Sequence, residues 1–122
     1  MRRDSFCFAD RREEILENTN LELWMILMEP NTGRCVMYGD KVMHRLLEAD
    51  EEFTPEEYYI HWYNRINDGY YQYVNMAMEN IIQTGKITQV EYTWNHPVRG
   101  DVMVRCMGVR IKDRDGMICV EG

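Results

Sequence analysis

The sequence lacks a long apolar run, a signal-peptide pattern and a basic stripe. No apolar stretch approaches the roughly 20 residues that a transmembrane helix needs, and the charged N-terminus MRRDSFCFADRREE does not fit a signal peptide. Asp and Glu number 21 against 14 Lys and Arg, so the 122-residue chain carries a net charge of −7. This charge opposes binding to a phosphate backbone. We therefore expect no membrane insertion by this segment and no nucleic-acid partner.

Metal-binding and disulfide spacings of cysteine are missing as well. The four cysteines, Cys7, Cys35, Cys106 and Cys119, are scattered without any C-x-x-C pair. A buried free thiol behaves as a small hydrophobe, so this usage fits a reducing cytoplasm better than a disulfide scaffold. We predict a cytoplasmic location, with the cysteines filling the core.

Catalytic motifs are absent too. There is no Ser-His-Asp order, no Gly-rich phosphate loop and no metal-binding helix motif. His44, His61 and His96 are too far apart in the chain to form a metal site by local spacing. His44 or His61 can in principle ligate haem, but we favour supporting polar roles for both. We predict that this chain is not an enzyme, and the sequence assigns it no cofactor and no metal.

The first third of the chain contains a short helical pattern and a hairpin. Asp10 with Glu13 forms a capping box for a helix that ends near Asn18. Two strand-like runs, 21–28 and 34–38, flank an Asn/Gly turn. The first run is nearly continuously apolar, which indicates a central strand that is buried on both faces.

Helices are predicted in the middle of the chain. Asp40 can cap one helix, and Thr54 followed by Pro55 and Glu57 is a strong start signal for a second. The longest predicted helix, 70–84, is ended by Gly85 in the usual C-terminal glycine position.

A meander of three strands occupies residues 86–122. Gly100 lies in the turn between the first two strands, and an Asp-Gly pair at 115–116 leads into the third. Strands at both ends with helices between them predict an α+β domain, with one antiparallel sheet and helices on one side.

This order of elements resembles the PAS sensory fold. The likeness is to the subclass whose final strands carry Glu91-Tyr92, Arg110 to Asp113, Asp115-Gly116 and a closing Gly122. The turn from Asn31 to Gly33 also lies where the family has one. The resemblance implies a five-stranded antiparallel sheet with helices packed on one face. It divides the chain into an N-terminal flanking helix, 1–20, and a PAS-like sensor domain, 21–122.

The chain also departs from the family. The flavin-thiol string Asn-Cys-Arg-Phe-Leu-Gln of light-sensing relatives is absent, so a photochemical role is not expected. The family's His-Pro-x-Asp loop is missing, and His61-Trp62-Tyr63-Asn64 stands nearest to it. The chain ends where such modules continue into an output domain. We expect a fragment of a bacterial signalling protein.

Strand alternation gives each strand of the meander two faces. Val104, Cys106 and Gly108 share one face, and the resemblance implies that this face looks toward a ligand. The predicted ligand-pocket residues are Trp24, Trp62, Gln89, Val104, Cys106 and Gly108. The opposite, apolar face needs a cover, supplied by the N-terminal helix or a dimer partner. The predicted interface residues are Phe6, Phe8, Ile15, Met103, Met107, Val109 and Ile111.

The function that follows is a sensor or interaction module for signal transduction. The resemblance implies an input domain that binds a small molecule or partner and regulates a histidine kinase or a diguanylate cyclase elsewhere in the same polypeptide. Two-component or cyclic-di-GMP signalling and a homodimer are therefore expected. The alternatives are a ligand-free dimerisation module, whose pocket its own side chains fill, and a small α+β cavity enzyme. The sequence names neither the ligand nor the output domain.

Overall fold

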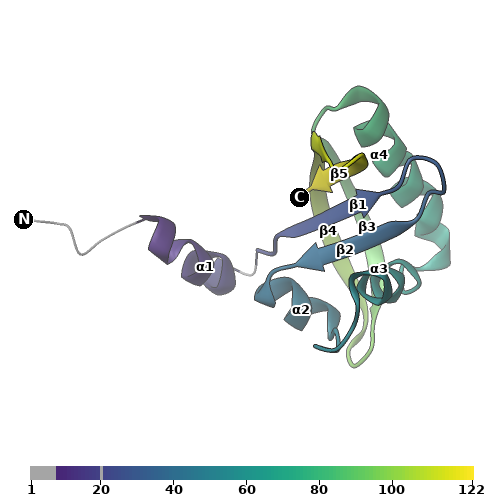
Figure 1. Ribbon diagram of the computed structural model, residues 1–122. Coiled ribbons are helices and arrows are strands. Elements are labelled where there is room, and N and C mark those ends of the chain that lie inside the picture. Colours follow the sequence, from purple (N-terminus) through teal and green to yellow (C-terminus); the bar gives the residue numbers. More distant parts are fainter. Residues whose placement is uncertain (1–7, 20) are drawn as a thin grey trace, which may run out of the picture.

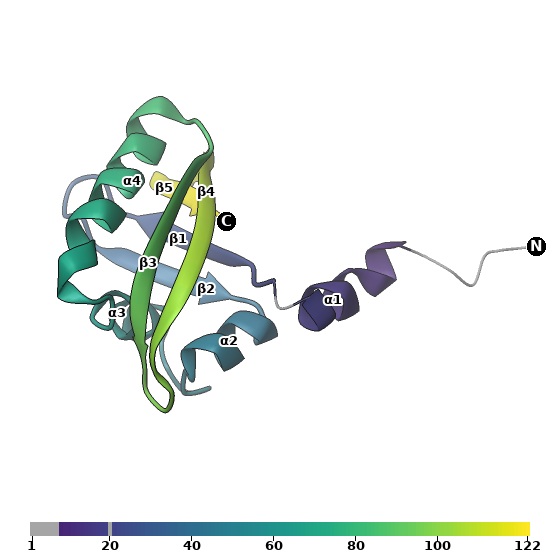
Figure 2. The same ribbon diagram turned by 180° about the vertical axis from the view of Figure 1, so that it is seen from behind.

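The computed structural model of the protein describes residues 8–19 and 21–122. The predicted interface residue Phe6 and the side chain of Phe8 lie outside this description. Helix α1, Phe8–Thr19, projects away from the sheet in both views (Figures 1 and 2). The described part of α1 therefore does not cover the sheet, which was one of the two covers that the sequence suggested.

Five strands form one antiparallel sheet, as predicted. They are β1, Trp24–Met28; β2, Cys35–Gly39; β3, Thr88–His96; β4, Gly100–Arg114; and β5, Met117–Glu121. Their order is β2-β1-β5-β4-β3, so β5 lies between the two hairpins that come from opposite ends of the chain. The interior position predicted for β1 is confirmed.

The two residues of the β4–β5 turn favour the backbone conformation that this hairpin needs. Asp115 and Gly116 have φ angles of 49° and 78°, so both central residues of the β4–β5 turn adopt the left-handed conformation. Asp-Gly is a favoured pair for this mirror-image turn, whose twist suits the flanking strands. The local sequence therefore sets the direction of β5 without help from distant contacts.

The helices lie between the two hairpins in sequence. They are α2, Lys41–Leu47; α3, Pro55–Tyr63; a 3-10 turn, Asp68–Tyr70; and α4, Tyr71–Thr84. Asp40 caps α2 by accepting the Met43 amide at 2.8 Å, as predicted. Gly85 ends α4 at a φ of 70°, and its N–H donates to the Ile81 carbonyl.

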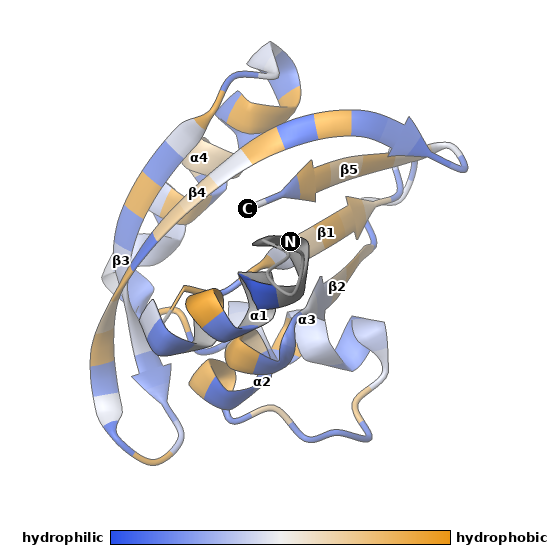
Figure 3. Cartoon of the chain, turned by 90° about the vertical axis from the view of Figure 1, so that its left-hand side faces the viewer, coloured by the Kyte–Doolittle hydropathy of each residue, from blue (hydrophilic) through white to orange (hydrophobic). Residues whose placement is uncertain are grey.

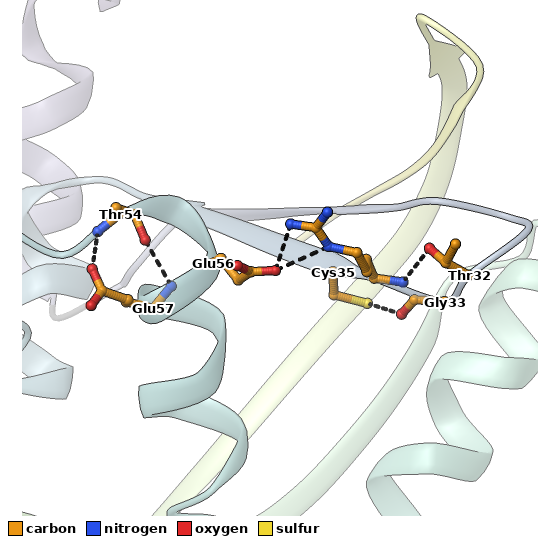
Figure 4. A network of polar contacts seen from close by, with 7 residues as sticks. Thr32, Gly33, Cys35, Thr54, Glu56 and Glu57 are labelled. Atoms are coloured by element: carbon orange, nitrogen blue, oxygen red, sulfur yellow. Dashed lines mark hydrogen bonds and ion pairs between the residues drawn. The ribbon is translucent and has the colours of Figure 1, made fainter.

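The capping box of α3 and an ion pair fix this helix against β2 (Figure 4). Thr54 accepts the Glu57 amide at 3.2 Å, and Glu57 accepts the Thr54 amide at 2.9 Å. The guanidinium of Arg34, just before β2, donates to Glu56 at 2.8 and 3.1 Å. Both ion-pair side chains are largely exposed, so the pair orients α3 more than it stabilises the fold.

The core lies on the helix-bearing face of the sheet. Trp94 of β3 is fully buried, and its indole N–H donates to the Trp62 carbonyl at 2.8 Å. The Trp62 indole in turn donates to the Tyr92 hydroxyl at 2.9 Å. These two bonds tie α3 to β3 and satisfy the indole N–H groups of Trp62 and Trp94, as burial of such groups requires.

Candidate functional site

A cavity of about 270 Å³ lies between the helices and the inner face of the sheet. Trp24 and Ile26 of β1 and Val104 of β4 line the sheet side, and Met78 and Ile81 of α4 line the helix side. The walls are almost entirely apolar and aromatic. A concave pocket with mainly apolar walls is the usual form of a small-molecule site.

Five of the six predicted pocket residues lie on the wall of this cavity. They are Trp24, Trp62, Val104, Cys106 and Gly108. The sixth prediction, Gln89, is wrong in position, because Gln89 is exposed and does not line the cavity. In the β3–β4 ladder Gln89 pairs with Met107, whereas Val90 pairs with Cys106. Since paired residues of antiparallel strands share a face, Val90 is the residue of β3 that points inward.

Two glycines make room for the indole of Trp24. A Cβ on Gly108 would lie 3.0 Å from the Trp24 ring and 3.1 Å from Ile81. A Cβ on Gly122 would meet the Trp24 ring and the Met107 carbonyl. The ring therefore lies over a side-chain-free stretch of β4 and the end of β5, which sets the shape of the cavity at this end.

Cys106 and Tyr92, two polar side chains on the sheet side of the cavity, stay protonated at physiological pH. Burial, supplemented by the charge of Glu22, raises the pKa of the Cys106 thiol to about 11. Burial also raises the pKa of the Tyr92 hydroxyl. A protonated thiol is a poor nucleophile and metal ligand, so these groups suit hydrogen bonding to a bound molecule rather than covalent chemistry.

Sequence reasoning missed Glu22, which lines the cavity together with the predicted residues. Glu22 stands two positions before Trp24 and four before Ile26, and both of these face the cavity. Alternation along the extended chain places all three on one side. The alternation that places Trp24 inward therefore also predicts an inward Glu22 when it is extended two residues back along the chain. Glu22 precedes the first residue of β1.

The outer face of the sheet carries apolar side chains among charged ones, since Arg105 lies between Met103 and Met107 along β4 and pairs with Glu91 of β3. Met103 is 64% exposed and Met107 is 55% exposed, whereas Val109 and Ile111 on the same strand are partly buried. Figure 3 shows hydrophobic and hydrophilic residues alternating along much of β4. In α1, Ile15 is 37% exposed. Of the predicted interface residues of β4, Met103, Val109 and Ile111 do not line the cavity, whereas Met107 also borders it. Their role in an interface stays a prediction.

The three histidines lie away from the cavity wall. His61 Nε2 lies 2.6 Å from the Leu47 carbonyl, and His44 packs edge-on against Tyr58. His96 Nδ1 accepts the amides of Val98 and Arg99 in the β3–β4 turn. Within residues 8–19 and 21–122, no group of three His, Cys, Asp or Glu side chains is arranged to hold a metal ion. No helix in the same ranges has the length and apolar character to cross a membrane.

Comparisons with known sequences find no matching family and no matching curated protein. Solved structures do match. The chain is similar to a domain of a proposed light and redox sensing histidine kinase from Haloarcula marismortui, with 17% identity and a TM-score of 0.64 over 92% of this chain and 94% of that chain. It is also similar to the N-terminal domain of a diguanylate cyclase with a PAS/PAC sensor from Marinobacter aquaeolei, with 16% identity and a TM-score of 0.56 over 82% and 90% of the two chains.

A third similar structure is an RNA-binding light-oxygen-voltage receptor, at 12% identity and a TM-score of 0.56. The match covers 82% of this chain and spans 28% of the receptor. At sequence identities this low, the matches show the similarity of the fold alone. The subclass motif of the last three strands therefore stays a prediction. With the strand order β2-β1-β5-β4-β3 and helices on one face, the chain has the fold of the PAS sensory domains.

Proposed function

We propose that this chain is a sensory input module that binds a small apolar molecule in its cavity and regulates an output domain of the same polypeptide. The observation that carries the proposal is the cavity of about 270 Å³ behind the sheet, lined by Trp24, Trp62 and Cys106. The related folds occur in a histidine kinase and a diguanylate cyclase. Either type of output domain is compatible with this proposal, as is a cytoplasmic location.

The position of Trp24 suggests how occupancy is transmitted. The Trp24 backbone exchanges two hydrogen bonds with Gly122, at 3.0 and 3.1 Å. Its ring also contacts Gly108 and Gly122 at one end of the cavity. A ligand that displaces this ring moves the start of β1 and the end of β5 together. Such a ligand shifts the output only if it binds the two arrangements with different affinities.

A cavity-filling substitution tests this function. Cys106→Trp places an indole in the cavity, and Met103→Trp places the same side chain on the exposed outer face as a matched control. We expect a screen of small aromatic and aliphatic compounds to find binders that shift the indole N–H resonances of the wild type. Those binders should also bind Met103→Trp and fail to bind Cys106→Trp. Equal binding by both variants would remove the cavity as the site.

A second candidate function is dimerisation through the outer face of the sheet. The exposed methionines Met103 and Met107 favour it, because large apolar side chains gathered on a sheet face usually contact a partner. This function is compatible with ligand binding, since the two faces of the sheet are separate. As a ligand-free dimerisation module, the chain would form dimers and none of the screened compounds would bind.

A further inference from the structure

Glu22 turns inward, whereas the next residue, Leu23, turns outward. Leu23 is 45% exposed and does not line the cavity, whereas Glu22 is partly buried and lines it. Hydrophobic burial alone favours the opposite arrangement. The charged side chain therefore occupies the position from which a carboxylate can reach the cavity.

The surroundings of Glu22 contain acidic and neutral groups. Asp40 lies beside it, held by the Leu23 amide at 3.3 Å and the Met43 amide at 2.8 Å. The charge of Glu22 acts on both Tyr92 and Cys106, which places the carboxylate on the cavity side of the chain. Burial is the main effect on its own pKa, which is raised, and among the residues that the structure describes no cation contributes to the shift.

The arginine that lines the same cavity does not offset this charge. Arg105 lines the cavity, but its guanidinium pairs with Glu91 at 2.8 Å on the exposed side of the β3–β4 ladder. Two carboxylates, Glu22 and Asp40, thus lie close together beside an otherwise apolar cavity. A buried carboxylate is stabilised by pairing with a cation or a strong hydrogen-bond donor.

We propose that the cavity selects molecules with an apolar body and a cationic amine head, and that Glu22 binds the head. The inference rests on the proposed ligand-binding function and names the chemical class of the ligand. The apolar walls accept the body, and Trp24, which also lines the cavity, has an electron-rich ring face that favours a cation further. Ligands with a carboxylate head are disfavoured, because two like charges would be buried together.

Three probes that share one apolar body and differ only in the charge of the head group test which part of a ligand the cavity recognises. They are 4-phenylbutylamine, 4-phenylbutan-1-ol and 4-phenylbutyric acid, which at pH 7 carry a positive, a neutral and a negative head. Isothermal titration at low salt measures their affinities for the wild type and for Glu22→Gln, which keeps the shape and removes the charge. Met103→Gln, exposed on the outer face of the sheet and away from the cavity wall, is the control variant.

For the wild type we expect the amine to bind roughly tenfold more tightly than the alcohol, and the acid to bind most weakly, because charge-assisted hydrogen bonds are about twice as strong as neutral ones. In Glu22→Gln the preference for the amine should disappear while the alcohol keeps its affinity. Met103→Gln should bind all three like the wild type.

Two results overturn the inference, and they have different meanings. If the alcohol binds the wild type as tightly as the amine, or if Glu22→Gln keeps the amine preference, the cavity binds ligands without selecting amines. Ligand binding as proposed above then stands. If none of the three probes binds the wild type at millimolar concentration, the cavity is closed to small molecules. That result overturns the ligand-binding function and the amine selectivity together.

Discussion

The inner and outer faces of strand β4 both carry apolar side chains but have opposite surroundings, and the outer face also carries the charged Asp101 and Arg105. Val104, Cys106 and Gly108 look into the cavity, whereas Met103 and Met107 are more than half exposed. The inner side chains are small and leave space that helix α4 does not fill. The outer ones are long and flexible, which suits an adaptable contact surface. Apolar character alone therefore does not tell a ligand wall from an interface.

The largest expected difference between the two faces is in stability. Trp94→Ala removes a fully buried indole and its hydrogen bond to Trp62, so we expect a loss of about 3–5 kcal/mol in the free energy of unfolding. Met103→Ala, on the outer face, should change it by less than about 0.5 kcal/mol. Urea denaturation followed by fluorescence and circular dichroism measures both. A loss for Met103→Ala as large as that for Trp94→Ala would mean that the outer face belongs to a packed core.

The inner face should also resist added volume. Gly108→Val introduces a side chain against Trp24 and Ile81, whose nearest atoms lie 3.0 and 3.1 Å from the new Cβ. Overpacking of this kind costs about 1–3 kcal/mol. Met107→Val, the adjacent outward position, is the matched control and should be close to neutral. A Gly108→Val protein with wild-type stability would indicate that Trp24 moves aside freely.

On the outer face, substitutions should act through the charge that they add rather than through side-chain volume. If it forms the dimer interface, Met107→Asp buries an unpaired carboxylate and should weaken dimerisation at least tenfold, about 1.4 kcal/mol. Gln89→Asp adds the same charge on the same face at a position that is already polar, so a smaller change is expected. Size-exclusion chromatography with light scattering across a concentration series reports the dissociation constant. A wild type that stays monomeric at the highest concentration would contradict an interface on this face.

The smallest effect should come from the one acidic side chain that lines the cavity. Burial raises the pKa of Glu22, the charge of Asp40 adds to this rise, and a bond to its own backbone amide opposes it. Because the folded-state pKa is raised, the contribution of Glu22 to stability is fully present below the ordinary value of 4.5 and is lost as pH rises through the folded value. Tyr92 and Cys106, which also face it, stay neutral over this range.

Glu22→Gln should therefore stabilise the protein at pH 7 and have little effect at pH 4. The gain should be no more than roughly 1 kcal/mol, since the side chain is only partly buried and solvent screens its charge. Denaturation curves of both proteins at the two pH values measure the difference. A destabilised variant at pH 7 would show that Glu22 has a favourable partner in the folded state.

Local signals in the sequence predicted most of the elements because their causes are local. The Asp40 cap, the Thr54–Glu57 capping box and the Gly85 stop each depend on a few neighbouring residues, and all three appear in the structure. Alternation along β4 also assigned Val104, Cys106 and Gly108 to one face without reference to another strand.

Relations between strands were decided only by the tertiary structure. Gln89 was assigned to the cavity because alternation divides β3 into two faces without saying which face meets the inner face of β4. The pairing of Val90 with Cys106 settles this, and it is a long-range contact. The inward turn of Glu22 likewise depends on Asp40 and on the packing of Trp24 against Gly108 and Gly122. The sequence by itself thus determined the elements and the two faces of β4. The tertiary structure decided which faces meet and where space remains between them, because both depend on side chains far apart in the chain.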